Sequence, residues 1–143
     1  MNSTLNCNGK LVSLSSPVVM GILNITPDSF YDGGKFFSEE KIIEHTRKMI
    51  AEGATIIDVG GQSTRPRAEM ISQEEEIRRV IPVIELLKKN FPYTTISIDT
   101  FRSRVAEEAV KAGASIVNDI SGGTMDEKML DRKSTRLNSS HAN

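Results

Sequence analysis

Four short apolar runs, each ended by polar side chains, constrain the fold of this chain more than any other feature. They lie at about 18–24, 55–59, 96–99 and 115–119. Each run is rich in β-branched residues and has the length of a buried strand. Segments with apolar residues at helical spacing separate them. Strands that alternate with helices predict right-handed crossovers and a parallel sheet.

The segments between the strands carry the start and stop signals of helices. Gly53 and Gly113 are the expected stop signals of the first and third helices. In the second helix, Pro82 is expected to kink the helix or to remove a hydrogen bond. The glutamates at 74–76 are expected to form a solvated first turn. The predicted cap residues are Ser38 for the first helix, Ser72 with Glu75 as a capping box for the second, and Thr100 or Ser103 for the third.

Two folds contain such a sheet, an open doubly wound sheet and an eight-stranded barrel. Every predicted strand here ends in a polar side chain, which a barrel needs around its whole rim. An open sheet concentrates its site at one switch point. We therefore predict an α/β fold, a partial (β/α)8 TIM barrel with the first four strands and their helices. The turn signal Asn8-Gly9 predicts a small β-hairpin before them.

Composition divides the chain into three parts. Residues 1–16 are the predicted N-terminal hairpin and leader, and 17–130 the N-terminal half of the barrel domain. From Asp131 the sequence has almost no apolar residue and no periodicity. We expect 131–143 to be a disordered tail or non-native sequence. Since barrels of this kind need roughly 250 residues, we expect the natural reading frame to continue past Leu130 with further strands.

Charge and hydropathy exclude several classes of partner. The chain has 18 basic and 19 acidic side chains, a net charge of -1. This balance gives no electrostatic reason to expect nucleic-acid binding. No apolar run approaches the roughly 20 residues of a membrane span, and a single cysteine forms no internal disulfide. We expect a cytoplasmic protein with neither a nucleic-acid nor a membrane partner.

The polar side chains at the strand ends are the candidate functional residues. They comprise no histidine or cysteine, which argues against a nucleophilic triad and against zinc. Oxygen ligands suit Mg²⁺ beside a substrate phosphate. These residues are Asn24, Asp58, Asp99, Asn118 and Asp119.

The loops after the strands add groups for two kinds of ligand. Arg65, with the hydroxyls of Ser63 and Thr64 on a glycine-containing loop, suits an oxyanion such as a phosphate. Asp99 and Asn118, on neighbouring strands, suit a flat heterocycle with several N–H groups. The spacing thus predicts a ligand with a heterocycle and a phosphate.

These residues stand in motifs that resemble dihydropteroate synthase, of the pterin-binding family. The motifs occur in the family's order and span about 18–121, so the resemblance covers the N-terminal half of such an enzyme. Two positions depart from the family pattern: Gln62 replaces a frequent acidic residue, and Arg67 stands where glycine is common. The motifs are Asn24-Ile25-Thr26-Pro27-Asp28-Ser29-Phe30, Asp58-Val59-Gly60-Gly61-Gln62-Ser63-Thr64-Arg65-Pro66, Ser97-Ile98-Asp99-Thr100 and Asn118-Asp119-Ile120.

The resemblance implies a role in folate synthesis, in which 6-hydroxymethyl-7,8-dihydropterin diphosphate and p-aminobenzoate give dihydropteroate and pyrophosphate. It implies that Asn24 holds Mg²⁺, that Thr64 contacts the diphosphate, and that Asp58 supports the loops. The catalytic residues would be Asp99 and Arg65. The substrate-binding residues would be Thr26, Phe30, Ser63, Thr64, Pro66, Asp99 and Asn118.

Two alternatives remain at this stage. The chain as given, expected to be inactive alone, would be a non-catalytic barrel fragment that binds pterin or phosphate weakly. Otherwise the protein would be a folate-binding methyltransferase on the same barrel, against which the Thr26–Phe30 and Ser63–Pro66 loops argue. The full-length enzyme is expected to be a homodimer.

Overall fold

A parallel four-stranded sheet forms the centre of the structure, a computed structural model that describes all residues except 1–3, 8–9, 14–15, 32–36, 64–65 and 120–143. Its strand order is β3-β4-β5-β6, so each strand pairs with the next one along the chain. Every strand pair is parallel. The strands are β3 (Val19–Asn24), β4 (Ala54–Gly60), β5 (Thr95–Asp99) and β6 (Ile116–Asn118).

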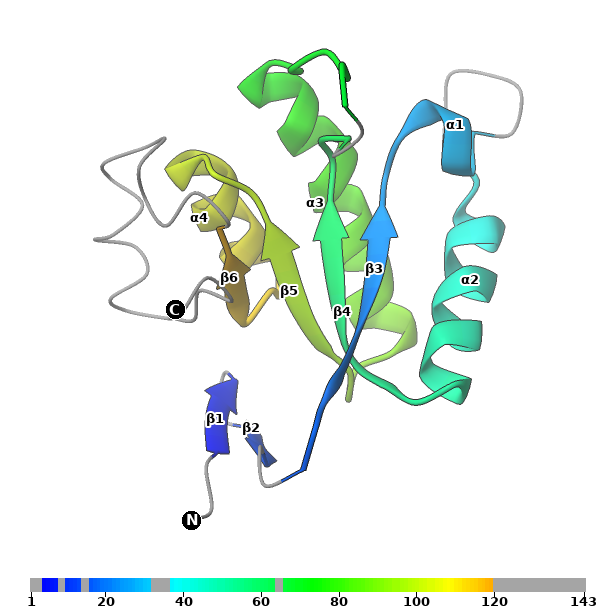
Figure 1. Ribbon diagram of the computed structural model, residues 1–143, viewed down its shortest axis with the longest axis vertical. Coiled ribbons are helices and arrows are strands. Elements are labelled where there is room, and N and C mark those ends of the chain that lie inside the picture. The colour runs from blue at the N-terminus through cyan, green and yellow to red at the C-terminus, as the bar shows by residue number, and fades with distance from the viewer. Residues whose placement is uncertain (1–3, 8–9, 14–15, 32–36, 64–65, 120–143) are drawn as a thin grey trace.

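Helices connect these strands and pack in a row along one side of the sheet (Figure 1). α2 contacts α3, and α3 contacts α4, as neighbouring helices of one layer do. A doubly wound sheet would have helices on both faces. The arrangement is therefore α/β with sequential parallel strands, as predicted for part of a (β/α)8 barrel. The helices are α1 (Pro27–Phe30), α2 (Glu39–Ala51), α3 (Gln73–Asn90) and α4 (Ser103–Ala112).

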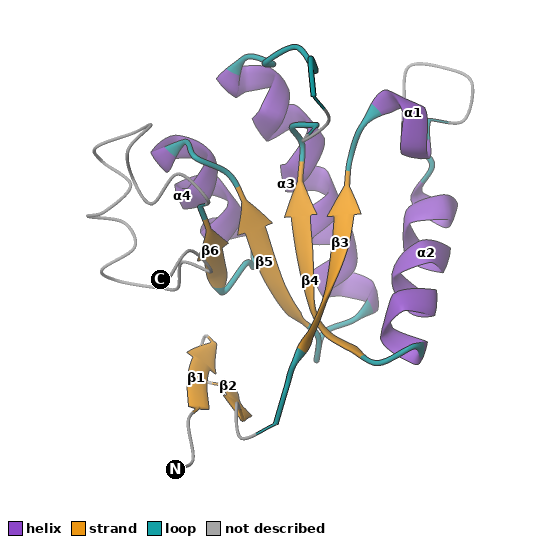
Figure 2. Cartoon of the chain, viewed as in Figure 1, coloured by secondary structure: helices purple, strands orange, loops and turns teal. Residues whose placement is uncertain are grey.

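Side chains alternate across the sheet and so separate the core from the opposite face. Leu23, Ile57, Ile98 and Val117 point into the main core beneath the helices. Their neighbours in sequence point to the other face, where the polar strand ends lie. Because the side chains of a strand alternate with period two, burial of the apolar set fixes which residues face the opposite side. Figure 2 shows the same strands ending at one edge of the sheet.

Of the three predicted helix N-caps, two are confirmed. Ser38 accepts a hydrogen bond from the Lys41 backbone N–H, and Ser72 accepts one from that of Glu75, as predicted for the two caps. The Glu75 carboxylate, predicted to complete a capping box, instead accepts from Arg78 and Arg79. The prediction for α4 was wrong. Its N-cap residue is Arg102, with no side-chain cap hydrogen bond, because the Thr100 hydroxyl instead accepts from the Arg102 backbone N–H.

The α3 helix differs from expectation at one position in its first turn. Glu76 is buried rather than solvated, with a side chain 1% exposed. The helix itself continues through Pro82, an exposed residue, whose ring nitrogen has no proton to donate to the preceding turn.

The N-terminal residues form a separate pair of strands. β1 (Thr4–Cys7) pairs antiparallel with β2 (Lys10–Ser13). The predicted turn residues Asn8 and Gly9 lie outside the described residues, so the Asn-Gly turn stays a prediction. The tail at 131–143 also lies outside them. No helix in the described part of the chain is long and apolar enough to span a membrane.

Candidate active site

Strand register places three predicted site residues in one row across the sheet. Asn24 pairs with Gly60, Gly60 with Asp99, and Asp99 with Asn118. We call these four residues the upper row, since they end the four strands. All four occupy the face opposite the helices. Register alone therefore brings Asn24, Asp99 and Asn118 together from three strands.

Gly60 leaves space in the upper row between two of these side chains. A Cβ built on Gly60 would lie 3.4 Å from Asn24 Oδ1 and 3.5 Å from Asp99 Oδ2. The amide and the carboxylate thus converge on the volume that a side chain at position 60 would fill. Glycine at this position keeps a small cradle open between an acceptor from β3 and one from β5.

A second row, one step lower on the same face, supports the first. It pairs Ile22, Asp58, Ser97 and Ile116. The buried Asp58 Oδ2 accepts a hydrogen bond of 3.0 Å from Asn118 Nδ2. Asp58 therefore holds the Asn118 amide from below, whereas the sequence suggested support for the loops.

Two aspartates of this face, Asp99 and Asp58, have a raised pKa. Burial and, to a smaller extent, the negative charges of Asp58, Glu76 and Asp119 together raise the pKa of Asp99 to about 7. Burial also raises the pKa of Asp58, although the Asn118 hydrogen bond opposes this. Asp99 therefore changes charge near neutral pH, at the rim of the sheet where a ligand can approach.

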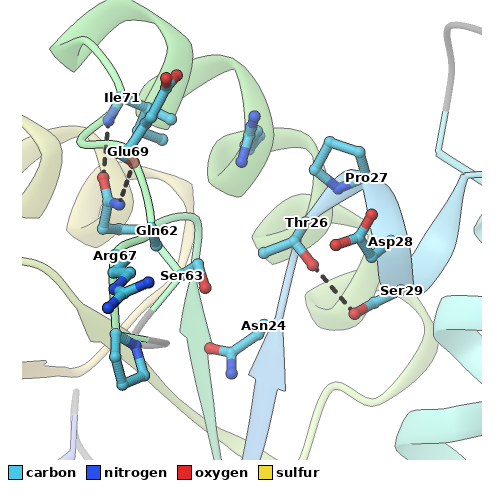
Figure 3. A pocket seen from close by; sticks show the side chains of 13 residues that line it. Asn24, Thr26, Pro27, Asp28, Ser29, Gln62, Ser63, Arg67, Glu69 and Ile71 are labelled. Carbon is cyan, nitrogen blue, oxygen red and sulfur yellow. Dashed lines mark hydrogen bonds between the residues drawn. The ribbon is translucent and has the colours of Figure 1, made fainter.

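A cleft of about 630 Å³ opens above the Asn24 end of the upper row. One wall is formed by residues 26–29 of the first loop (25–31), and the other by residues 62–63, 66–69 and 71 of the second loop (61–72). In Figure 3 Asn24 lies between the two walls, with Thr26 and Ser29 on one side and Gln62 and Ser63 on the other. The hydroxyls of Thr26 and Ser29 are hydrogen-bonded at 3.0 Å. The cleft is thus lined by amides and hydroxyls from both motif loops.

The second loop is held in shape by its own Gln62. The Gln62 Nε2 group donates to the Glu69 carbonyl at 2.8 Å, and Gln62 Oε1 accepts from the Ile71 backbone N–H at 2.9 Å. Arg79 donates to the Gly61 carbonyl at 3.0 Å. An acidic residue, which is frequent at this position in the family that the motifs resemble, has no N–H group. It could not form the hydrogen bond that the Gln62 amide donates to the Glu69 carbonyl.

Arg102 links the second loop to the end of β5, and sequence reasoning did not find it. Its guanidinium forms an ion pair of 2.7 Å with Glu76 and donates to the Ile71 carbonyl at 2.6 Å. The guanidinium also lies over the Phe101 ring, 4.8 Å from its centroid. A charge at the turn into α4, three residues after Asp99, was the available signal, but no pattern in the sequence pairs it with Glu76.

The predicted substrate residues are distributed between the cleft, the upper row and the core. Thr26, Ser63 and Pro66 line the cleft with Asn24. Phe30 instead packs in the core at 8% exposure, with its ring edge against His45. Its role against p-aminobenzoate stays a prediction. Thr64 and Arg65 lie outside the described residues, so their roles are also predictions.

The site has one feature that fits a hard cation. Asn24 Oδ1 is buried and has no hydrogen-bond partner in the part of the chain described. Such an oxygen suits an ion that takes most of its other ligands from water and phosphate, as Mg²⁺ does. No group of three or more His, Cys, Asp or Glu residues among those described is placed to hold a metal by itself.

Comparison with known proteins agrees with this geometry. The family model of pterin binding enzymes matches residues 20–134. The dihydropteroate synthase of Bacillus subtilis is 59% identical over 112 residues, which are 78% of this chain and 39% of the relative. The folic acid synthesis protein fol1 of Pneumocystis carinii is 62% identical over 112 residues, 78% of this chain and 15% of that protein.

A solved structure extends the likeness to the fold. The dihydropteroate synthase of Xanthomonas albilineans, with 4-aminobenzoic acid, superposes with a TM-score of 0.87 at 41% identity. The match covers 97% of this chain and 50% of that one, so the chain spans about half the length of that enzyme. The chain belongs to the pterin-binding enzyme family and is homologous to the dihydropteroate synthases over most of its length.

Proposed function

We propose that this chain is the N-terminal half of a dihydropteroate synthase site on a (β/α)8 barrel. The protein would join 6-hydroxymethyl-7,8-dihydropterin diphosphate to p-aminobenzoate and release pyrophosphate. The observation that carries the proposal is the upper row, in which Asn24, Asp99 and Asn118 share one face, with a cleft between the two motif loops at its Asn24 end. The 143-residue chain alone is proposed to bind without turnover. The full-length enzyme would be a cytoplasmic homodimer.

The two halves of the pterin substrate would occupy different parts of the site. Asp99 and Asn118 would accept and donate hydrogen bonds to the ring, with the amide held by Asp58. The diphosphate would extend toward Asn24 and Thr64. Asn24 Oδ1, which lacks a hydrogen-bond partner among the described residues, would hold Mg²⁺. Bound Mg²⁺ would supply positive charge against the diphosphate.

The reaction would be a substitution at the methylene carbon of the pterin. The bond from this carbon to the diphosphate oxygen breaks, and the amine nitrogen of p-aminobenzoate forms a bond to the same carbon and loses a proton. The residues need to stabilise a departing polyanion and an electron-poor ring, which is electrostatic work. Asp99, ionised above its pKa of about 7, would favour the developing positive charge, and Arg65 the departing anion.

The loops would complete the aminobenzoate site. Thr26 on the first loop and Ser63 and Pro66 on the second would surround the aromatic amine, and Phe30, which packs in the core behind the first loop, would shape this pocket from below. The support for this is that 4-aminobenzoic acid accompanies the Xanthomonas albilineans enzyme, and 7,8-dihydropteroate another structure of it. Closure of the two loops would exclude water from the reactive carbon.

Binding of the pterin substrate tests the proposal. Isothermal titration of the 143-residue chain with 6-hydroxymethyl-7,8-dihydropterin diphosphate, with Mg²⁺ present, should show one site. Asn118→Leu should abolish binding, because it removes the amide that faces the ring. Arg104→Gln, an exposed change on α4, is the control. Absence of binding to the wild-type chain, verified as folded by circular dichroism, would refute the proposal.

A further inference from the structure

Arg67 has a backbone conformation that its side chain does not favour. Its φ is 67°, in the left-handed region, and among the described residues it is the non-glycine residue with positive φ. A Cβ in this region lies too close to the neighbouring carbonyl, so an L residue costs more there than glycine. Glycine would adopt this backbone conformation without strain, yet the chain has an arginine here.

The loop around Arg67 fixes this conformation from both sides. Gln62 bonds to Glu69 and Ile71, and thus closes the loop with Arg67 between its ends. Arg102 holds the Ile71 carbonyl from below at 2.6 Å. Local strain persists where the surrounding structure determines the backbone, and it is common at ligand sites.

The side chain lines the same cleft as Asn24 and Ser63. Figure 3 shows Arg67 and Ser63 on the same wall of the cleft, across from Thr26 and Ser29. The nearby cation Arg79 is already bound to Glu75 and to the Gly61 carbonyl. Arg67 forms no ion pair or hydrogen bond with a described residue, although Asp28 and Glu69 also line the cleft. Its charge and donors are therefore available to a ligand.

We propose that Arg67 is an additional anion-binding residue that adds affinity for the carboxylate or phosphate of a ligand in the cleft. A guanidinium presents a planar set of donors that matches either group in a bidentate manner. The identity of the anion rests on the proposed function. The carboxylate of p-aminobenzoate and the phosphate groups of pyrophosphate are its two possible sources, and one experiment separates them.

The experiment measures binding of three probes to the 143-residue chain by isothermal titration with Mg²⁺ present. The probes are p-aminobenzoate, its uncharged counterpart 4-aminobenzamide, and pyrophosphate. Arg67→Gln removes the charge and keeps the strained backbone, whereas Arg67→Gly removes both. Arg104→Gln removes one exposed charge outside the cleft and controls for the change in net charge.

The expected result couples a loss of binding to a gain of stability. Both Arg67 variants should bind one anion about tenfold more weakly, the order expected for a charge-assisted hydrogen bond, while 4-aminobenzamide is unaffected. Urea denaturation should show a higher midpoint for Arg67→Gly and an unchanged one for Arg67→Gln. If Arg67 served stability alone, Arg67→Gly would not both weaken anion binding and raise the urea midpoint.

The outcomes separate this proposal from the proposed function. Loss of p-aminobenzoate affinity alone assigns Arg67 to the carboxylate, and loss of pyrophosphate affinity alone assigns it to phosphate. The proposal is overturned if Arg67→Gln binds p-aminobenzoate and pyrophosphate as tightly as the control Arg104→Gln does. It is also overturned if the wild-type chain binds neither of these two anions. In either case binding of the pterin diphosphate by the wild-type chain leaves the proposed function standing.

Discussion

Replacement of Arg102 by alanine should strongly lower the free energy of unfolding. Arg102 forms its ion pair with a Glu76 side chain that is 1% exposed, and it is itself 15% exposed. Arg102→Ala leaves that carboxylate buried without its cation and removes the hydrogen bond to the Ile71 carbonyl. Removing one partner of a buried pair costs roughly 3–5 kcal/mol. The free energy of unfolding of a small domain is about 5–15 kcal/mol, so the variant should lose a large part of its stability.

The assay is urea denaturation followed by far-ultraviolet circular dichroism, because the chain has no tryptophan for fluorescence. Arg104→Ala is the matched control, since Arg104 is an exposed arginine on the same helix. It should change the unfolding free energy by no more than about 0.5 kcal/mol. Glu76→Gln should fall between the two, because the amide oxygen still accepts from the guanidinium. Equal unfolding free energies for Arg102→Ala and Arg104→Ala would refute the reasoning.

Three further predictions concern the upper row. Asp99→Asn should stabilise the chain at pH 8 and leave it unchanged near pH 3.8. The pKa of Asp99 rises from 3.8 to about 7 on folding. Between these two pH values the folded state binds more protons than the unfolded state, so the stability of the wild-type chain falls as the pH rises. Unfolding free energies measured across this pH range test the prediction, and the same pH dependence in both proteins would contradict it. Asn118→Ala should cost roughly 1.5–3 kcal/mol in urea denaturation, because it leaves the buried Asp58 carboxylate without this donor, whereas a loss below 0.5 kcal/mol would contradict it. Gly60→Ala should leave the urea midpoint nearly unchanged, since its methyl fits at 3.4 Å from Asn24 Oδ1, but should weaken pterin diphosphate binding at least tenfold, and unchanged affinity would show that no ligand enters this cradle.

Sequence periodicity predicted the sheet and its helices because the signals are local. β-branched runs, Ser38 and Ser72 as caps, and glycines at helix ends act within a few residues. The row that joins Asn24, Asp99 and Asn118 also followed, since parallel strands bring their carboxyl ends to one edge.

The contacts that the sequence did not reveal are all between distant segments. The Glu76–Arg102 pair joins residues 26 positions apart and the Asp58–Asn118 bond joins residues 60 apart. A glutamate run in a first turn has the composition of a solvent-exposed turn, and only the position of the loop over α3 buries Glu76. Likewise, the positive φ of Arg67 depends on how Gln62 closes the second loop. Such contacts are set by tertiary packing, which no local pattern records.

The central claim is that the upper row binds the pterin diphosphate, and backbone and side-chain amide spectra test it most directly. Titration of the ¹⁵N-labelled chain with the pterin diphosphate and Mg²⁺ should shift the side-chain amide signals of Asn24 and Asn118, together with the backbone amide of Asp99. Asp99→Asn should weaken the shifts, and Arg104→Gln should not. Saturable shifts confined to residues outside the cleft and the upper row, or no shifts at all, would contradict the account.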